Sequence, residues 1–288
     1  MGTLSLDGPL WRRLARWGAG GPEWFVRIAP AVVGVVVCAL APRRRLAIRR
    51  NLRRVRGRRG RLRESVDVAR TFVSYATCLT EVLGSGTGRG KVPEVSVRGQ
   101  AYLHDALSDG RGILFVTAHA GGWESAGALL SRDLGLSVMI VERAERDADA
   151  GAIQDQARGG RGLLVAHVGD DPLSALPIIR HLREGGVVAL QIDRVPVGVR
   201  AREVTMFGER SRVPDGPLRL AVLTGAPVLS VFAARQGHRS YEIVVGRPLR
   251  MSRSATEAEL DAAAQELADN LCAFARSRPT QWFHFSGE

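Results

Sequence analysis

From residue 92 onward, short apolar runs alternate with amphipathic runs, and this alternation restricts the possible folds more than any other feature. The apolar runs are rich in β-branched residues, as strands are, and the runs between them have helical spacing. The predicted strands are 95–99, 112–119, 137–143, 162–168, 187–193, 226–235 and 240–249, and helices are predicted within 102–110, 123–135, 172–186 and 216–225. Strands alternating with helices predict a layered α/β fold with a mostly parallel central sheet flanked by helices.

The last predicted helix has clear boundary signals. Thr256 and Glu259 have the spacing of a capping box, and apolar residues then recur on one helical face as far as Phe274. Pro279 follows the expected end of the helix, because proline rarely continues one.

Residues 1–90 have a different pattern and are predicted to be helical. Apolar residues between Val66 and Leu83 recur every three or four positions, and Gly84 ends the run. The glycine-rich stretch 84–91 is predicted to be a loop. The chain therefore divides into an N-terminal helical region, 1–90, and an α/β domain, 91–288.

The positive charge is concentrated in one segment. Residues 43–63 contain twelve arginines and no acid, and the net charge of the whole chain is +12, so the remainder is formally neutral. Such a block attracts an anionic membrane or a nucleic acid, unless it is only a solvated helix face. It lacks interleaved aromatic residues for base stacking, so no nucleic-acid partner is expected.

An apolar run, 24–42, directly precedes the arginines and starts with Trp24. Its uninterrupted apolar part, 31–41, is shorter than the roughly 20 residues of a membrane-spanning helix. Tryptophan before an apolar run and arginines after it favour a segment that lies in or dips into a membrane surface. A buried core helix is the alternative.

The segment "ILFVTAHAGGWESAG", 113–127, combines a predicted strand end, a histidine and two glycines. His119 ends the strand, Gly121 and Gly122 allow a sharp turn, and Glu124 opens the next helix. A turn can bring His119 and Glu124 face to face at the carboxyl end of a strand, where open α/β sheets bind ligands. This context predicts that His119 is a general base oriented by Glu124, and a structural histidine is the alternative.

The same spacing at His104 and Asp109 lies within a predicted surface helix, where positions five apart point in different directions. It is interpreted as a chance match, so spacing alone does not define the site.

The predicted base has no partner nucleophile in the sequence. No serine occurs in a G-x-S-x-G elbow, and Cys38, Cys78 and Cys272 lie in apolar runs, where they are expected to be buried and reduced. The activated group is therefore expected to be a hydroxyl of the substrate. With glycine amides and a helix N-terminus to stabilise an oxyanion, this chemistry is acyl transfer to an alcohol.

The segment "TAHAGGWE" resembles the His-x-Gly-Asn-Trp-Glu motif of the bacterial lipid A biosynthesis acyltransferases, part of the lysophospholipid acyltransferase superfamily. Further segments resemble that family in the same order along the chain: "RRLARWGAG" with "PRRRLAIRRNLRRV", "VERAERDA", "QIDR", "TGAPV" and "PTQWFHF". The sequence departs from the family at Gly122, where asparagine is usual, and after Trp282, where basic residues are usual.

The resemblance implies a glycerolipid-acyltransferase-like fold and transfer of a fatty acyl chain from acyl carrier protein or acyl-CoA to a hydroxyl of a glycolipid or lysophospholipid. It implies a place on the cytoplasmic face of the bacterial inner membrane, with no metal or organic cofactor. It also implies that Arg143 and Arg194 pair with a phosphate of substrate or donor. The other substrate-binding positions that it implies are Gly121, Gly122, Trp123 and Asp193. An ion pair closing a strand end is the alternative role for Asp193 and Arg194.

Several acceptors and two other protein classes stay open at this point. The acceptor could be a lipid A precursor, a phosphatidylinositol mannoside, a lysophospholipid or a secondary-metabolite alcohol. One rival class is an arginine-driven nucleic-acid-binding protein. The other is a metal-dependent hydrolase, whose ligands would come from His119, Glu124, His167, Asp170 and Asp193.

Overall fold

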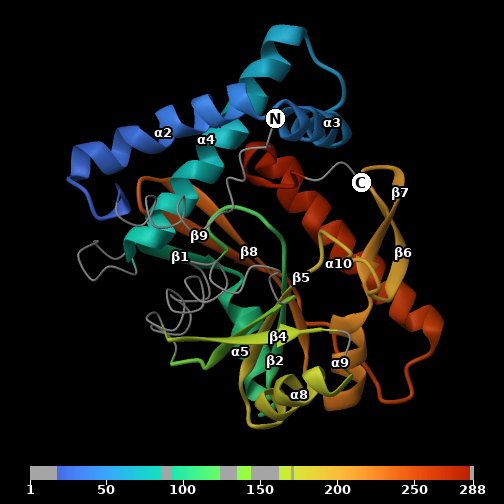
Figure 1. Cartoon of the computed structure of the whole chain (residues 1–288). Coiled ribbons are helices and arrows are strands. Elements are labelled where there is room, and N and C mark those ends of the chain that lie inside the picture. The colour runs from blue at the N-terminus through green and yellow to red at the C-terminus, as the bar shows by residue number, and fades with distance from the viewer. Residues whose placement is uncertain (1–17, 86–92, 124–134, 144–161, 170–171, 286–288) are drawn as a thin grey trace.

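The computed structural model describes residues 18–85, 93–123, 135–143, 162–169 and 172–285 (Figure 1). Its elements, in chain order, are α2 (Glu23–Leu40), α3 (Pro42–Arg56), α4 (Arg61–Ser85), β1 (Glu94–Arg98), α5 (Gln100–Ser108), β2 (Ile113–Thr117), β3 (Val138–Arg143), β4 (Leu163–Val168), η1 (Pro172–Ala175), α8 (Leu176–Arg183), β5 (Val187–Gln191), β6 (Ala201–Met206), β7 (Glu209–Pro214), α9 (Gly216–Thr224), β8 (Val228–Gly237), β9 (Ser240–Val245), α10 (Glu257–Ser277) and η2 (Pro279–Gln281).

Seven strands form one sheet in the order β1-β9-β8-β2-β5-β3-β4. The five strands from β8 to β4 are parallel to one another, whereas β9 runs antiparallel to β8 and β1 runs parallel to β9. All seven strands predicted from the sequence are present, and the layered α/β fold with a mostly parallel sheet is confirmed. Strand β2 is buried along its whole length, as a central strand covered on both faces must be.

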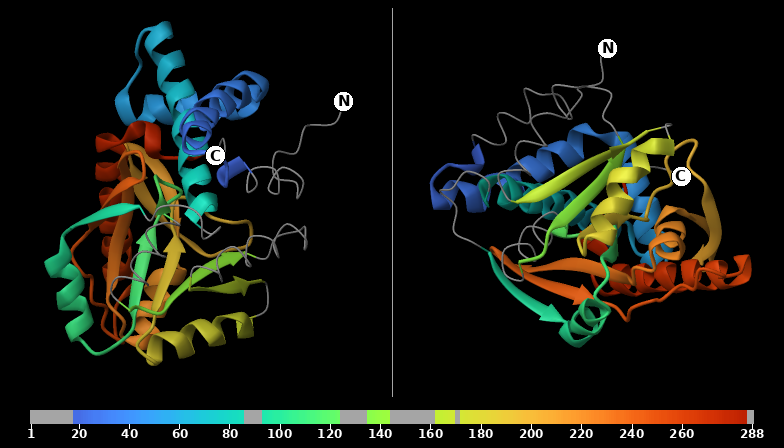
Figure 2. Two further views of the ribbon diagram at one scale, coloured as in Figure 1. Left: turned by 90° about the vertical axis from the view of Figure 1, so that its left-hand side faces the viewer. Right: turned by 90° about the horizontal axis from the view of Figure 1, so that it is seen from below.

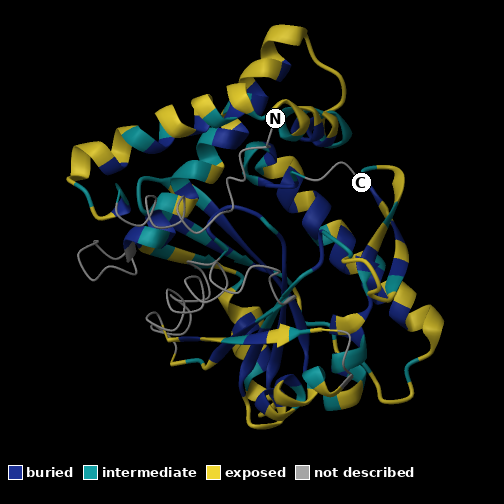
Figure 3. Ribbon diagram, in the orientation of Figure 1, coloured by how far each residue is buried: buried dark blue, intermediate teal, exposed yellow. Residues whose placement is uncertain are grey.

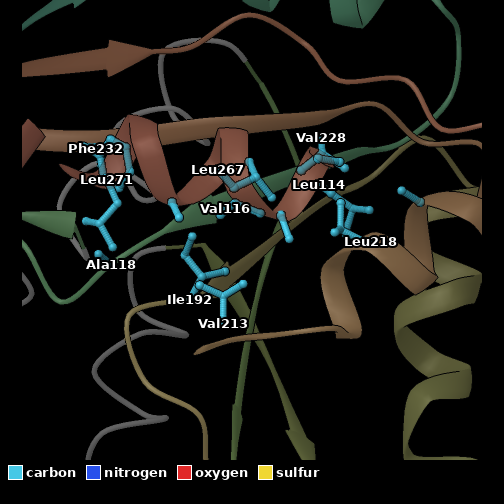
Figure 4. Packing of buried hydrophobic residues seen from close by; sticks show 14 of the residues in the cluster. Leu114, Val116, Ala118, Ile192, Val213, Leu218, Val228, Phe232, Leu267 and Leu271 are labelled. Atoms are coloured by element: carbon cyan, nitrogen blue, oxygen red, sulfur yellow. The ribbon is translucent and has the colours of Figure 1, made fainter. Parts of the chain in front are cut away.

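Helices cover both faces of the sheet. On one face, side chains of β2 and β8 pack against α8, α9 and α10. Figure 4 shows Val116 of β2 beside Leu267 of α10, and Leu271 of α10 beside Phe232 of β8. On the other face, Leu103 of α5 packs against the opposite sides of the same strands. Because the two layers exclude water from the sheet, its backbone can support a rigid site at its edge.

Helix α10 begins as the sequence predicted. The Thr256 hydroxyl accepts a hydrogen bond from the Glu259 amide at 3.3 Å, and the Glu259 carboxylate accepts one from the Thr256 amide at 2.7 Å. These reciprocal bonds form a capping box, which satisfies amides that the first helical turn leaves free.

The antiparallel hairpin of β6 and β7 was not predicted from the sequence. Its strands carry several charged residues, so no apolar run marks them. Arg202 is nevertheless buried, because its guanidinium donates hydrogen bonds to Asp215, Glu257 and Asp261. In the two-residue turn, Phe207 and Gly208 both have positive φ, 54° and 82°. That conformation is common for glycine but costs a residue such as phenylalanine about 1–2 kcal/mol.

Helices α2, α3 and α4 form a layer at the end of the sheet opposite α8 (Figure 2). Helix α2 packs closely on α4 at Gly34, where an added Cβ would lie 2.7 Å from the Cα atom of Val73. The predicted helical character of this region is confirmed where α2, α3 and α4 lie. The boundary near residue 90 stays a prediction, because residues 86–92 lie outside the described residues.

Helix α2 is longer than the uninterrupted apolar run, because it continues through Arg27 and Pro30. Among the described residues, it is the one helix long and apolar enough to cross a membrane by length and composition, and 22% of it is buried. The three cysteines are buried and free, as predicted.

Candidate active site

The backbone turns sharply after β2, and this turn places His119 at the carboxyl end of the sheet. The Ala120 amide donates to the Ala118 carbonyl at 2.7 Å, which closes a tight turn around His119. Gly121 follows with a φ of 51°, and a Cβ there would lie 1.8 Å from the Ala233 carbonyl oxygen of β8. Only glycine fits this position, because both the dihedral angle and the contact with β8 exclude a side chain.

Gly122 is a glycine for a different reason. A Cβ at residue 122 would lie 2.2 Å from a ring carbon of Tyr241, which is buried against the turn. The Tyr241 hydroxyl donates a hydrogen bond to the Glu81 carboxylate of α4, which also accepts from the Arg235 guanidinium at 2.9 Å. The tyrosine ring therefore fills the space that a side chain at residue 122 would need.

The His119 imidazole lies against the Asp193 carboxylate. The ring Nδ1–H donates to Asp193 Oδ1 at 2.9 Å, and the His119 backbone amide donates to the same oxygen at 3.2 Å. The Asp193 side chain is fully buried, whereas 30% of the His119 side chain is exposed. With Nδ1 held in this way, Nε2 is the ring nitrogen left to take a proton from a substrate.

The order of the strands explains why these two residues meet. Strand β5 is the parallel neighbour of β2, and Thr117 pairs with Gln191 at the ends of the two strands. The Ile192 amide then donates to the Thr117 carbonyl at 3.0 Å, which extends the pairing by one residue. Asp193 is next in the chain, so its carboxylate reaches the turn that carries His119.

Asp193 is a stable anion in this environment. Burial alone would raise its pKa, but the charge and hydrogen bond of His119, together with the Arg194 guanidinium, hold the pKa below its usual value. A permanently charged carboxylate stabilises the imidazolium that forms when His119 takes a proton. The pair is therefore suited to general-base catalysis.

The C-terminal segment Gln281–Phe285, named here the closing segment, lies beside the same turn. The Trp282 indole N–H donates to Asp193 Oδ2 at 3.2 Å, and the Phe283 amide donates to the His119 carbonyl at 2.7 Å. The Gly121 amide donates to the Gln281 carbonyl at 2.8 Å. The expectation that glycine amides stabilise an oxyanion is therefore wrong for Gly121, whose N–H is already used.

The structure places the other predicted site residues as follows. Glu124, the predicted orienter of His119, lies outside the described residues. The Trp123 ring lies 6.4 Å from the His119 ring, measured between centroids, in an edge-to-face arrangement. Arg143 is the last residue of β3, two strands from β2, and its side chain is not described.

Asp193 and Arg194 were expected to contact substrate, and both contact protein groups here. Both Asp193 oxygens accept hydrogen bonds, from His119 and Trp282, and the side chain is buried. The Arg194 guanidinium donates to the Phe283 carbonyl at 2.9 Å, while its Nε–H has no partner among the described residues. The Asp193 carboxylate therefore forms part of the catalytic pair with His119.

His284 is a second histidine near the pair. Its side chain is buried, and the pKa of the ring is lowered to about 4, mainly because burial disfavours the charged form. His284 is only 7% exposed, so a substrate has far less access to it than to His119. His119 is the better candidate for the base.

The described residues contain no group of three His, Cys, Asp or Glu side chains that could hold a metal ion. His167, one of the ligands of the metal hypothesis, lies on β4, three strands away from β2. Three strand spacings amount to roughly 14 Å. Glu124 and Asp170, two more of those ligands, lie outside the described residues.

Comparisons with known proteins show which family the chain belongs to. The chain is 30% identical over 189 residues to a phosphatidylinositol mannoside acyltransferase of Mycobacterium tuberculosis (strain CDC 1551 / Oshkosh), covering 65% of this chain and 57% of that protein. It is 26% identical over 240 residues to a protein of the same name from Mycolicibacterium smegmatis, covering 82% of this chain and 76% of that one. The chain thus spans little more than half the length of the mycobacterial relative with 30% identity.

A solved structure, the 1-acyl-sn-glycerophosphate acyltransferase PlsC from Thermotoga maritima, aligns with a TM-score of 0.41 at 15% identity, covering 93% of this chain and 98% of that one. The sequence model of the bacterial lipid A biosynthesis acyltransferases matches residues 14–287, which include the His119 turn, Asp193 and the closing segment. The chain therefore belongs to the family of bacterial lipid A biosynthesis acyltransferases.

Proposed function

We propose that this protein is a membrane-associated O-acyltransferase that moves a fatty acyl chain from a thioester donor to a hydroxyl of a lipid. The observation that carries the proposal is the hydrogen bond between the exposed His119 ring and the buried Asp193 carboxylate at the carboxyl end of the sheet. Membership of the acyltransferase family supports the choice of reaction. The donor is the thioester of acyl carrier protein or of coenzyme A.

The reaction follows from the pair. His119 Nε2 takes the proton of the acceptor hydroxyl while the hydroxyl oxygen attacks the thioester carbonyl. Asp193 stabilises the imidazolium formed in this step. The tetrahedral intermediate then collapses, the carbon–sulfur bond breaks, and the imidazolium returns its proton to the leaving thiolate. The products are an ester and a free thiol, and His119 is neutral again.

A phosphatidylinositol mannoside is the acceptor that we favour. Both mycobacterial relatives described above carry this substrate in their names, and the sequence identity to them extends over most of this chain. A lipid A precursor, a lysophospholipid and a secondary-metabolite alcohol are the acceptors to test against it.

The experiment offers the purified protein acyl-CoA or acyl carrier protein thioesters with each acceptor class in detergent micelles and identifies products by mass spectrometry. We expect a phosphatidylinositol mannoside to gain the mass of one acyl chain, with release of one thiol per ester formed. Acylation of another acceptor alone would reject the favoured substrate. Thiol release without any ester would reject the transferase assignment in favour of thioester hydrolysis.

The outer face of α2 supports the membrane part of the proposal. Figure 3 shows α2 largely exposed along the side that faces away from α4. The large apolar side chains exposed on this helix are Trp24, Phe25, Ile28, Val32, Val33, Val35, Val36 and Leu40. A contiguous apolar face of this kind is stabilised when it enters the interfacial region of a bilayer.

Nine of the twelve arginines in the block fall into two sets. One set forms ion pairs within the protein: Arg53 pairs with Glu64, Arg54 with Glu209, and both Arg56 and Arg59 with Asp67, at 2.7–3.1 Å. The other set is exposed and has no acidic partner among the described residues, and consists of Arg43, Arg50, Arg58, Arg61 and Arg63. The exposed set is available to bind anionic lipid head groups. Each such arginine contributes about 1 kcal/mol of binding free energy near an anionic membrane surface. We propose that it faces the cytoplasmic leaflet, whose anionic lipids attract such a set.

Replacing Val32 and Val36 by aspartate should weaken binding to phosphatidylglycerol-containing vesicles at least tenfold. Both side chains are about half exposed on the outer face of α2, so two carboxylates there would oppose insertion and repel anionic lipid without disturbing the core. Vesicle co-flotation measures the binding. Leu176→Asp, at the exposed start of α8, is the matched control and should float as the wild type does. Unchanged flotation of the double variant would show that α2 does not bind the membrane.

A further inference from the structure

We propose that Trp282 is a positioning residue for the catalytic pair, and that the closing segment holds the His119 turn in the geometry that the reaction needs. The inference rests on the proposed function, because it names what sets the orientation of the proposed base. From the sequence, this segment was noted only for its resemblance to the family.

The Trp282 indole completes the coordination of the Asp193 carboxylate. His119 occupies Oδ1 through its ring and its backbone amide, and the indole N–H occupies Oδ2. The Asp193 side chain has no exposed surface, so solvent does not reach it to replace a lost donor. Because His119 holds one oxygen and Trp282 holds the other, the carboxylate cannot rotate away from the imidazole.

Backbone contacts connect the closing segment to both sides of His119. The Phe283 amide bonds to the His119 carbonyl, and the Gly121 amide bonds to the Gln281 carbonyl. The Gln281 side-chain amide bonds to both the amide and the carbonyl of Arg235 on β8, at 2.8 and 2.9 Å. The segment is therefore fixed to the sheet at the residue before Trp282.

The indole ring is held by its own neighbours. The Phe207 ring lies 5.5 Å from it and the His284 ring 5.2 Å, between centroids. Phe207 is the residue with positive φ in the turn between β6 and β7. Backbone strain of this kind persists where the surroundings need the side chain in one place, and here that place is against Trp282.

The far end of the closing segment is attached to the helical layer. Asn51 of α3 donates to the His284 carbonyl at 2.6 Å. The Phe285 ring lies 5.2 Å from the rings of both Phe72 and Tyr75 of α4. The segment thus connects the layer of α2, α3 and α4 with the turn that carries the base.

The hydrogen bond from Trp282 also affects the acid–base behaviour of the pair. A donor to Oδ2 stabilises the negative charge on Asp193. This weakens the electrostatic attraction between the carboxylate and the His119 imidazolium. The other titratable and charged groups that act on Asp193 are Arg194 and His284, and Arg54 of α3 acts on His284. Replacing the indole by a benzene ring keeps all of these charged groups but also alters the ring that packs on His284, so a control that changes only ring contacts is needed.

The test is Trp282→Phe, which removes the N–H and keeps an aromatic ring. We expect kcat to fall about tenfold with little change in KM. The NMR titration of the His119 ring should differ from that of the wild type, because the Asp193 carboxylate then interacts differently with the imidazolium. The titration is read by NMR of labelled histidine in the protein without substrate, with the His119 signal assigned from its absence in His119→Ala.

Phe285→Leu is the matched control, because it removes ring contacts in the same segment but no bond to Asp193. It should lower the melting temperature and leave the His119 titration unchanged. In the wild type, the Trp282 indole N–H resonance should titrate with the same midpoint as the His119 ring, a measurement that needs no variant to fold.

The outcomes separate this inference from the proposed function. An unchanged His119 titration in Trp282→Phe, or an indole resonance that does not follow it in the wild type, would overturn the positioning role. Absence of acyl transfer by the wild type would instead overturn the proposed function, since both NMR measurements are made without substrate.

Discussion

Replacing His119 by alanine should lower kcat for acyl transfer by about a thousandfold and leave the protein folded. A general base positioned at a reacting hydroxyl contributes about 10²- to 10⁴-fold, and nothing else at the turn offers a basic nitrogen with the same exposure among the described residues. The turn itself is held by backbone bonds to Gln281 and Phe283, which alanine retains. Product formation is measured by mass spectrometry, and folding by circular dichroism and melting temperature.

The chain contains its own control for this experiment. His104 and Asp109 repeat the spacing of His119 and Glu124, but His104 is exposed on α5 and bonds to Gln100 at 3.2 Å. His104→Ala should retain wild-type turnover. A folded His119→Ala protein with normal turnover would remove the assignment of the base.

Asp193→Asn should lower kcat by about 100- to 1,000-fold. The amide has the same shape as the carboxylate but carries no charge, so it cannot stabilise the imidazolium. Its NH₂ group can also turn towards Nδ1, which would favour the wrong tautomer of His119. Steady-state kinetics measure the loss, and Asp269→Asn on the exposed side of α10 is a control expected to have no effect.

The pH dependence of stability gives a second test of whether Asp193 is charged in the folded protein. Its folded-state pKa is lower than the usual value of 3.8, so the folded protein binds fewer protons than the unfolded chain at acid pH. The stabilisation due to the charged form is fully present above about pH 4 and is lost as the pH falls towards the lower folded-state pKa. The difference in the free energy of unfolding between wild type and Asp193→Asn should therefore shrink below pH 4.

Comparison with Glu124→Gln shows which carboxylate orients the base. We expect the larger loss at Asp193, because its oxygen already occupies Nδ1 of His119. Loss of activity in Glu124→Gln with near-normal activity in Asp193→Asn would give the orienting role to Glu124 instead.

Most of the sheet could be predicted from the sequence because its strands are short runs of mainly apolar residues, and the central ones are the most apolar. The run at 112–119 contains a strand of five buried residues, and the run at 187–193 contains a strand whose first two residues are buried and whose other three are partly buried. The hairpin of β6 and β7 has no such run, since Arg202 is buried through ion pairs and not through apolar contact. A pattern of hydrophobicity does not report that kind of burial.

The catalytic pair shows a similar limit. His119 was found because the strand, the glycines and the turn are adjacent in sequence. Asp193 was expected near the site, but its bond to His119 crosses 74 residues and depends on β5 being the neighbour of β2. The bond from Trp282 to Asp193 crosses 89 residues. Strand order decides the first contact, and the path of the chain after α10 decides the second; one sequence specifies neither.

The contact between Gly122 and Tyr241 has a consequence for exchanging parts between relatives. A chimera that carries asparagine at residue 122, as is usual in the family, would need a smaller residue at 241 to make room for it. Shrinking residue 241 would in turn leave Glu81 without its phenol donor, beside Arg235. The contacts thus link the turn, β9 and α4, and grafting one member without the others should yield a less stable protein.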